Sequence, residues 1–381
     1  MVSLAFSIVL GVALVLYVFF FLLFIFGWSS LRGCSGSSRL PEKQVSVVIV
    51  ARNEEAHIGA LLSDLSKQRY PKACTEIIVV NDCSTDNTAA AVLPYIGERV
   101  RLLQLEDYVD VVHFKGSFKK MAIQVAVQQA RGEWIARVDA DCRVGPHWLS
   151  TLMCCQQARQ AVMVCGPVNF SHDGSLMQQL IALDNLGLMG IGGATLAMGM
   201  PTICNGANML FSRRAFLEAG GYTSNLHRAS GDDVFLLHAL FKNSGGRVVF
   251  CRDKAAEVIT GVANSWTEVL EQRRRWASKL DAVRNIPLVL MAATVLVFNL
   301  FLFIAAAGLM WTQEHLFVFL LAGVTKWILD VTFLTQVTRF AGQWRLLRLF
   351  LIGELLHGVL VMWVGLTAWK KSITWKGRPI S

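Results

Sequence analysis

A charge-free apolar run from Val2 to Trp28 restricts the possible folds of this chain more than any other feature. A helix needs roughly 20 apolar residues to cross the hydrocarbon core of a bilayer. A cleaved signal peptide is the alternative, but no basic segment precedes the run and no A-x-A site follows it. We therefore predict an uncleaved membrane anchor at 1–30. Later apolar segments of similar length occur at Ile286 to Trp311, Leu316 to Val337 and Leu349 to Trp369.

These segments predict a multi-pass integral membrane protein, with about three membrane segments and a basic tail in 285–381. Hydrophobic residues make up 54% of the chain, which is too many for a purely soluble protein. The intervening range 44–284 holds most of the acidic residues and reads as one water-facing domain. Glu354 and His357 lie on one helical face of the last apolar segment, either as functional groups or as a polar contact between helices.

The net charge of +9 is concentrated beside the membrane segments. Arg32, Arg39 and Lys43 follow the first run, and Arg273 to Arg275 precede the second. By the positive-inside rule, both junctions and the domain between them face the cytoplasm, in a cell (inner) membrane. Binding to nucleic acid is the other common meaning of a basic chain, and this placement disfavours it.

The range 44–284 alternates between strand and helix patterns. Val45 to Val50 is continuously apolar and rich in β-branched residues, as a strand buried on both faces should be. Further strands are predicted at Ile77 to Val80, Val100 to Leu105 and Trp134 to Val138, with helices after most of them. We predict an α/β domain with a mainly parallel sheet, whose ligands bind at the carboxyl ends of its strands.

Polar side chains follow the predicted strands at that edge. Asn53 and Glu54 come after the first strand, Asp82 after the second, and Asp139 and Asp141 after the fourth. Two carboxylates separated by one residue can share a hard cation such as Mg²⁺ or Mn²⁺, although two ordinary loop aspartates give the same pattern. Asn53, Glu54 and Asp82 are predicted to bind the nucleotide sugar, with Asp82 accepting hydrogen bonds from the nucleoside. Capping of the following helix accounts for Asp86.

Two later motifs carry further candidates. Gly231-Asp232-Asp233 precedes an apolar helix, where one acid is explained by the helix dipole and the second could act as a general base. The run 272–276 reads Gln-Arg-Arg-Arg-Trp directly before a membrane segment. It is either a basic patch that faces solvent or lipid head groups, which we predict for Arg273 and Arg274, or a cation site for a diphosphate leaving group.

The order of these motifs resembles that of family-2 glycosyltransferases, in particular the D, D-x-D, E-D, Q-x-x-R-W pattern of their membrane-bound branch. The resemblance covers Val45 to about Lys279 and is carried by these segments: Ala51 to Glu55, Asn81 to Asp86, Asp139 to Asp141, Asn205 to Asn208, Gly220 to Tyr222, Gly231 to Asp233, and Gln272 with Arg275 and Trp276.

The resemblance implies a GT-A fold, an inverting transfer and a UDP-sugar donor held by Mg²⁺ or Mn²⁺. It implies that Asp82 contacts uridine, that Asp139 and Asp141 bind the metal and diphosphate, and that Asp233 is the general base. The same likeness assigns Lys119 to the nucleotide and Gln272, Arg275 and Trp276 to the diphosphate and acceptor. The family usually has Glu where this chain has Asp232.

The layout favours transfer of one hexose or N-acetylhexosamine to a lipid hydroxyl on a sphingolipid, hopanoid, carotenoid or similar acceptor. The segment count is smaller than in polysaccharide synthases, and the tail from Ser372 to Arg378 is similar to that of ceramide glucosyltransferase-like enzymes. The alternatives are a processive polysaccharide synthase and a catalytically silent protein that binds nucleotide sugars.

Overall fold

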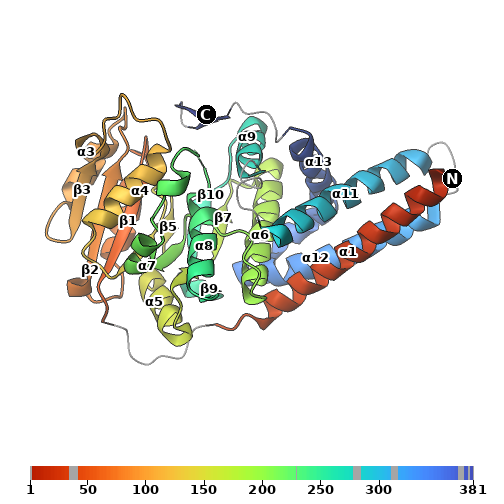
Figure 1. Ribbon diagram of the computed structural model, residues 1–381, viewed down its shortest axis with the longest axis horizontal. Helices are drawn as coiled ribbons and strands as arrows, with labels where there is room; N and C mark the ends of the chain where they lie inside the picture. The colour runs from red at the N-terminus through yellow and green to blue at the C-terminus, as the bar shows by residue number, and fades with distance from the viewer. Residues whose placement is uncertain are drawn as a thin grey trace. The chain divides into compact units, whose positions relative to one another are not determined.

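The computed structural model describes residues 2–33, 42–228, 230–277, 285–309, 316–367, 373–375 and 378–380. Contacts between Cα atoms divide the chain into two compact units, which are described separately (Figure 1). The sheet unit comprises Leu31–Ser171, Ile203–Val262 and Ser372–Ser381. The helical unit comprises Met1–Ser30, His172–Thr202 and Ala263–Lys371. The chain therefore leaves the sheet unit at residue 172 and returns to it at 203.

The sheet unit is built on a seven-stranded sheet in the order β3-β2-β1-β4-β8-β6-β9. Only β8 runs against its neighbours, so the predicted mainly parallel α/β sheet is confirmed. Its strands are β1 (Val45–Ala51), β2 (Thr75–Asn81), β3 (Val100–Gln104), β4 (Trp134–Arg137), β6 (Met163–Cys165), β8 (Met209–Ser212) and β9 (Val248–Phe250).

Helices follow the strands as the apolar spacing predicts. In α2, Ile58, Leu61, Leu62 and Leu65 are all buried, which places them on one face of the helix. Helix α4 packs on β1 and β2. Helix α5 begins at Trp148, directly after its cap residue His147. The helices of the unit are α2 (Ile58–Ser66), α3 (Thr88–Val92), α4 (Phe118–Gln129), α5 (Trp148–Arg159), α7 (Arg213–Glu218) and α8 (Asp232–Asn243).

Two smaller sheets complete the unit. Strands β5 (Arg143–Val144), β10 (Val258–Gly261) and β7 (Val168–Ser171) form a three-stranded sheet in that order. This sheet joins the segment after the D-x-D motif to the end of the sheet unit. Strands β11 (Ile373–Trp375) and β12 (Arg378–Ile380) form an antiparallel hairpin within the tail. Lys376 and Gly377 of the tail motif lie outside the described residues.

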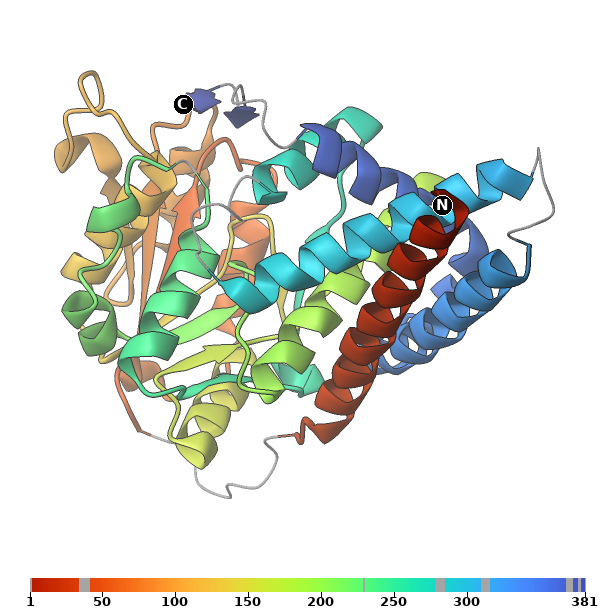
Figure 2. The same ribbon diagram turned by 45° about the vertical axis from the view of Figure 1, so that its right-hand side comes forward.

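The helical unit contains long apolar helices that run beside one another, as Figure 2 shows for α1, α11 and α12. Five helices within the described residues are long and apolar enough to cross a membrane, which indicates membrane association. They include α13 together with the 3₁₀ turn Trp344–Leu349 that precedes it. The helices of the unit are α1 (Val2–Ser30), α6 (Leu176–Ala197), α9 (Trp266–Ala277), α11 (Ile286–Leu309), α12 (Leu316–Ala341) and α13 (Phe350–Thr367).

Helix α6 is a membrane-length helix inside the range 44–284, which the sequence pattern assigned as a whole to a water-facing domain. Buried residues make up 67% of its apolar window, against 28% or less for the other four candidates, so α6 is the most buried of the five helices. Close packing explains this burial. A Cβ atom on Gly190 would lie 2.5 Å from Val337, and one on Gly27 would lie 2.5 Å from the carbonyl oxygen of Ala194.

Candidate active site

The predicted site residues of the sheet unit follow three adjacent parallel strands. Strands β2, β1 and β4 are neighbours in that order, so their carboxyl ends share one edge of the sheet. Asn53, Asp82 and Asp139 follow β1, β2 and β4 respectively. The backbone amide of Asp82 donates to the carbonyl of Ala51 at 2.8 Å, which joins the ends of the first two strands. The edge predicted from the sequence is therefore present.

Hydrogen bonds connect the loops after β1 and β2. Asn53 adopts a left-handed backbone with φ of 53°, which asparagine tolerates better than most residues. Its side-chain oxygen accepts from the amide of Thr85 at 2.9 Å. Arg52 donates to the carbonyls of Asp82 and Cys83 at 2.8 and 2.9 Å. The candidate nucleoside loops are thus held together before any ligand binds.

Glu54 and Asp86 also have defined roles in these loops. The amide of Glu54 donates to the Thr88 hydroxyl at 2.7 Å, and its carboxylate pairs with His57 at 2.9 Å. The Asp86 carboxylate accepts from the amide of Thr88, the first residue of α3, at 3.0 Å. This contact agrees with the capping interpretation of Asp86. The side chain of Asp82 is fully buried.

A cluster of opposite charges lies at the end of β4. The Lys119 ammonium is 3.0 Å from Oδ1 of Asp139, and Nη2 of Arg137 is 3.5 Å from the same oxygen. The same Nη2 also forms an ion pair with Asp232. Arg137, which is 2% exposed, therefore connects the D-x-D motif to the first turn of α8.

The protonation states follow from this pairing. Burial opposes the charge on Asp139, but the cations of Lys119 and Arg137 outweigh it and lower the pKa of that carboxyl. Burial likewise opposes the charge on Lys119, yet Asp139 and Asp232 raise the pKa of its ammonium. The pKa of Arg137 is also raised, because Asp232 and Asp139 outweigh its burial. Asp139, Lys119 and Arg137 are all charged at neutral pH.

Arg137 was not among the residues predicted from the sequence. The signal was present, because arginine is almost never fully buried unless it is paired, and this one stands in a strand predicted to be buried. Gly206 of the Asn-Gly-Ala-Asn motif lies against the guanidinium, where a Cβ atom would be 3.1 Å from Nη2. Asn208 of the same motif accepts from the Trp148 indole at 3.0 Å and donates to the carbonyls of Pro167 and Ala256. Gly206 thus leaves room for the buried guanidinium, and Asn208 fixes the motif to its neighbours.

Asp233 is the second residue of α8. Gly231, the residue before the helix, has φ of 89°, and a Cβ atom there would lie 2.6 Å from the ring of Phe235. Only glycine suits this backbone and this contact. The carboxylate of Asp233 accepts from the amide of Val234 at 2.7 Å. Tyr222 donates its hydroxyl to the carbonyl of Asp232 at 2.9 Å, which fixes the start of α8 further.

Asp141 is the second candidate metal ligand. Burial and the nearby carboxylates of Asp139 and Glu54 raise the pKa of Asp141, so a divalent cation beside it would relieve repulsion. The hydroxyl of Thr260 donates to Asp141 at 3.4 Å. The described residues contain no group of three or more His, Cys, Asp or Glu that could hold a metal. The pair still fits Mg²⁺ or Mn²⁺, which takes one or two carboxylates and completes its shell with phosphate and water.

Gln272, Arg275 and Trp276 lie on α9, which belongs to the helical unit. Their predicted approach to the diphosphate stays a prediction. Within α9, the neighbouring Arg273 is 7% exposed and stacks on the Trp276 ring, with Cζ 4.6 Å from the ring centre. The sequence favoured a solvated or lipid-facing patch for Arg273, and its burial corrects that interpretation.

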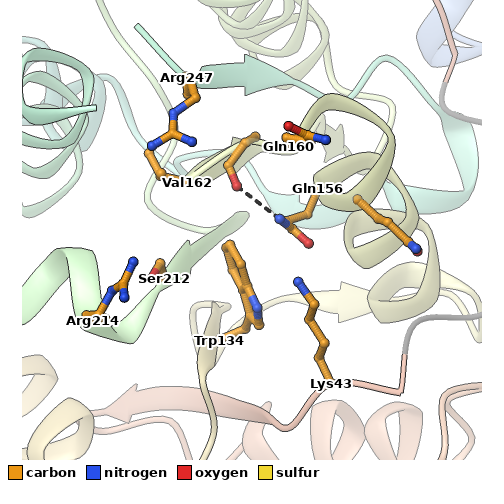
Figure 3. Close-up of a pocket in the computed structure, with 10 residues that line it drawn as sticks. Lys43, Trp134, Gln156, Gln160, Val162, Ser212, Arg214 and Arg247 are labelled. Carbon is orange, nitrogen blue, oxygen red and sulfur yellow. Dashed lines mark hydrogen bonds between the residues drawn. The ribbon is translucent and has the colours of Figure 1, made fainter. Parts of the chain in front are cut away.

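A pocket of about 400 Å³ lies at the other end of the sheet (Figure 3). Its lining includes Trp134, the first residue of β4, together with Lys43 and Arg247. Asp139 follows the opposite end of the same strand. This pocket is therefore separate from the candidate active site.

The class of the protein follows from comparison with known families. Residues 46–219 match the model for glycosyl transferase family 2, and residues 134–330 match that for glycosyl transferase family group 2. The second match spans more than half of the 381 residues. The chain therefore belongs to the family-2 glycosyltransferases, as its motifs predict.

Individual relatives are similar over short stretches only. Poly(ribitol-phosphate) beta-N-acetylglucosaminyltransferase TarS of Staphylococcus aureus strain Mu50 is 38% identical over 97 residues, which is 25% of this chain and 16% of TarS. The 4,4'-diaponeurosporenoate glycosyltransferase of S. aureus strain MRSA252 is 38% identical over 99 residues, or 26% of this chain and 24% of that protein. The chain thus spans less than a quarter of the length of either relative.

One solved structure is similar over nearly the whole chain. The mannosyltransferase PcManGT from Pyrobaculum calidifontis, in complex with GDP-Man and Mn²⁺, has a TM-score of 0.62 at 17% identity. The match covers 96% of this chain and 99% of that one. At this identity the likeness shows the fold alone. The predicted fold, a GT-A-like sheet domain flanked by long apolar helices, is confirmed.

Proposed function

We propose that the chain transfers a hexose or N-acetylhexosamine from a UDP-sugar to the hydroxyl group of a membrane lipid. The observation that supports this most directly is the charge cluster at the end of β4. Through Arg137, it joins Asp139 of the D-x-D motif to Asp232, the residue before the candidate base. The metal-assisted transfer proposed here would need a diphosphate-binding metal and a base close together, and this cluster couples the segments that carry their candidate residues.

In the proposed mechanism Asp139 and Asp141 would hold Mg²⁺ or Mn²⁺, which would supply positive charge to the leaving diphosphate. Asp233 removes the proton of the acceptor hydroxyl, so that its oxygen attacks the anomeric carbon and the configuration inverts. Lys119, already charged beside Asp139, stabilises the phosphates. The remaining predicted contacts are Asn53, Glu54 and Asp82 with the nucleoside, and Gln272, Arg275 and Trp276 with the diphosphate and acceptor.

The membrane-length helices support a lipid acceptor. The relative named for glycosylation of diaponeurosporenoate supports a hydrophobic acceptor of the carotenoid kind, beside the sphingolipids and hopanoids. The resemblance of the tail to ceramide glucosyltransferase-like enzymes points the same way. The relative named for poly(ribitol-phosphate) favours a polymer as the second candidate acceptor. We further propose that the sheet unit faces the cytoplasm, because basic residues flank the membrane segments.

Product analysis separates these acceptors. Purified full-length protein in lipid nanodiscs is incubated with Mn²⁺ and one donor at a time: UDP-glucose, UDP-N-acetylglucosamine or GDP-mannose. GDP-mannose is included because PcManGT was solved with it. Mass spectrometry should find a lipid that is one sugar heavier with a UDP donor. A long polymer, or a product from GDP-mannose alone, would contradict the proposal.

A further inference from the structure

The pocket opposite the candidate active site lies along the edge of the sheet at which β1, β4, β6 and β9 begin (Figure 3). Lys43, two residues before β1, is part of its lining. The other strand ends contribute one residue each: Trp134 of β4, Val162 before β6, Ser212 of β8 and Arg247 before β9. All five belong to the sheet unit, so this pocket is formed within one unit.

The described lining of the pocket has three positive charges and no negative one. The cations are Lys43, Arg214 and Arg247. Arg214 has a partner outside the lining, Glu218, at 3.6 Å. These two side chains are 87% and 68% exposed, and such a surface pair contributes little. The pocket therefore attracts anions.

Two of the cations are held in position. The Lys43 ammonium lies over the Trp134 ring, 5.4 Å from its centre. Nε of Arg247 donates to the carbonyl of Ser244 at 3.2 Å. Figure 3 shows these two basic side chains entering the pocket from different sides. Cations that are positioned beforehand lose less entropy when an anion binds between them.

One buried side chain of the pocket lacks a partner. Gln156 is 5% exposed, and its Oε1 accepts no hydrogen bond from the residues that the structure describes. Its Nε2 donates to the carbonyl of Ala161 at 3.1 Å. Because a carbonyl only accepts, this bond identifies the other end of the amide as the oxygen. A buried acceptor without a donor usually marks a missing water or ligand.

Helix α5 ends at this pocket, and a helix C-terminus by itself disfavours an anion. Here the amide of Ala161 donates to the carbonyl of Gln156 at 3.1 Å, and the amide of Gln160 donates to that of Gln157 at 3.3 Å. Two of the last carbonyls of the helix are thus already bonded. The side chains of all three glutamines line the pocket, so the helix end also supplies neutral amide groups.

These groups restrict the ligand. A phosphate dianion pairs with three cations better than a carboxylate does. Oε1 of Gln156 needs a donor, and an amine would bring a charge of the wrong sign, so the donor should be a hydroxyl group. The volume of about 400 Å³ lies in the usual range of small-molecule sites, roughly 300–1,000 Å³, and leaves room for more than a phosphate.

We propose that this pocket binds a phosphorylated polyol. Its phosphate lies among Lys43, Arg214 and Arg247, and one of its hydroxyl groups donates to Oε1 of Gln156. Two sources share this chemistry, namely a soluble sugar phosphate and the head group of an inositol phospholipid. The site is independent of the sugar transfer proposed above, because it involves neither the candidate base nor the candidate metal ligands.

Calorimetry tests the soluble source. The full chain in phosphatidylcholine nanodiscs, without metal, is titrated with glucose 6-phosphate, with glucose, and with propyl phosphate, which has no hydroxyl group on its carbon chain. Glucose 6-phosphate should bind most tightly. Lys43→Gln with Arg247→Gln should weaken its binding by about tenfold or more, because charge-assisted hydrogen bonds are lost. Lys67→Gln with Lys72→Gln is the matched control, since both lysines are exposed in the same unit outside the described lining. It should bind as the wild type does.

Native mass spectrometry tests the lipid source. From nanodiscs of phosphatidylcholine that also contain phosphatidylinositol, the wild type and the control should retain phosphatidylinositol, and the Lys43 and Arg247 double variant should lose it. Binding of either probe that depends on these two cations supports the proposal and identifies the source. No binding of either probe, equal binding by the double variant and its control, or equal affinity for glucose 6-phosphate and propyl phosphate would overturn it.

Discussion

At the scale of single residues, the site depends on one buried arginine between two acids that are far apart in the sequence. Arg137 pairs with Asp139 and Asp232, and the latter is Asp where the family usually has Glu. The sequence predicted both acids but not the cation between them, because strand patterns report burial and not partners. The shorter side chain of Asp232 is long enough here, because it forms an ion pair with Arg137 directly.

Replacing Arg137 by methionine should therefore destabilise the protein strongly. Removing one partner of a buried ion pair costs roughly 3–5 kcal/mol, because the remaining charge loses its compensation. Thermal unfolding should show a large loss in Arg137→Met and a partial recovery in Arg137→Met with Asp232→Leu. Arg214→Met, at a pair whose arginine side chain is 87% exposed, should change stability by less than about 1 kcal/mol. Additive effects of the two core changes would contradict the pairing.

Replacing Asp141 should stabilise the protein, whereas replacing Arg137 should destabilise it. Its pKa is raised, so the penalty for its ionisation is absent below the ordinary carboxyl pKa of about 3.9, grows as the pH rises from there to the raised value, and is constant above it. Without metal, Asp141→Asn should unfold at a higher temperature than wild type at pH 7, and this difference should shrink as the pH falls and vanish below about pH 3.9. The variant should also lose stabilisation by Mn²⁺ with UDP. A lower melting temperature without metal would show that Asp141 is not a repelled carboxylate.

At the scale of elements, the spacing of apolar residues predicted the strands and helices of the sheet unit. The order of the strands predicted the sheet edge at which the candidate site residues lie. Helix α6 could not be predicted in the same way. Its sequence contains glycines and polar residues, so its pattern indicated a part of the water-facing range. It is buried among other apolar helices, where small residues permit close packing. Pattern reasoning detects burial but does not say which unit buries a helix.

The start of α8 makes an element-scale prediction. Gly231→Ala adds a left-handed alanine and a clash with the Phe235 ring, whereas Gly220→Ala adds the strained backbone alone. Gly220 has φ of 78°, and a Cβ atom there would meet no atom within 4 Å. Gly220→Ala should cost about 1–2 kcal/mol, and Gly231→Ala should cost more and reduce sugar transfer. The melting temperature and the transfer rate of both variants decide this. Equal effects would indicate strain without the clash.

The packing of α6 makes a second prediction. Gly190→Ala puts a methyl group 2.5 Å from Val337, whereas Gly323→Ala on α12 meets nothing within 4 Å. The first should lower the thermal stability of the detergent-solubilised protein, and the second should leave it unchanged or raise it slightly. Unchanged stability in Gly190→Ala would mean that α6 is not tightly held by α12.

At the scale of the whole molecule, the chain combines a GT-A-like sheet unit with a unit of long apolar helices. The motifs predicted the family and the fold, because Asn53, Asp82 and Asp139 follow strands of the sheet and Asp233 lies at the start of a helix. They did not predict that Arg273, Asp184 and His357 form one cluster, since these residues come from three helices separated by 89 and 84 positions. Contacts across such distances leave no periodic signal in one sequence.

The most direct test of this account is sugar transfer by the purified protein and by Asp233→Asn. Wild type, with Mn²⁺ and a radiolabelled UDP-sugar, should move label into the lipid fraction, and a chelator should stop the reaction. Loss of a general base typically slows a reaction by about 10²–10⁴-fold, so Asp233→Asn should lose transfer on that scale while it still binds UDP. Transfer at the wild-type rate in Asp233→Asn, or none by wild type with any donor, would contradict the account.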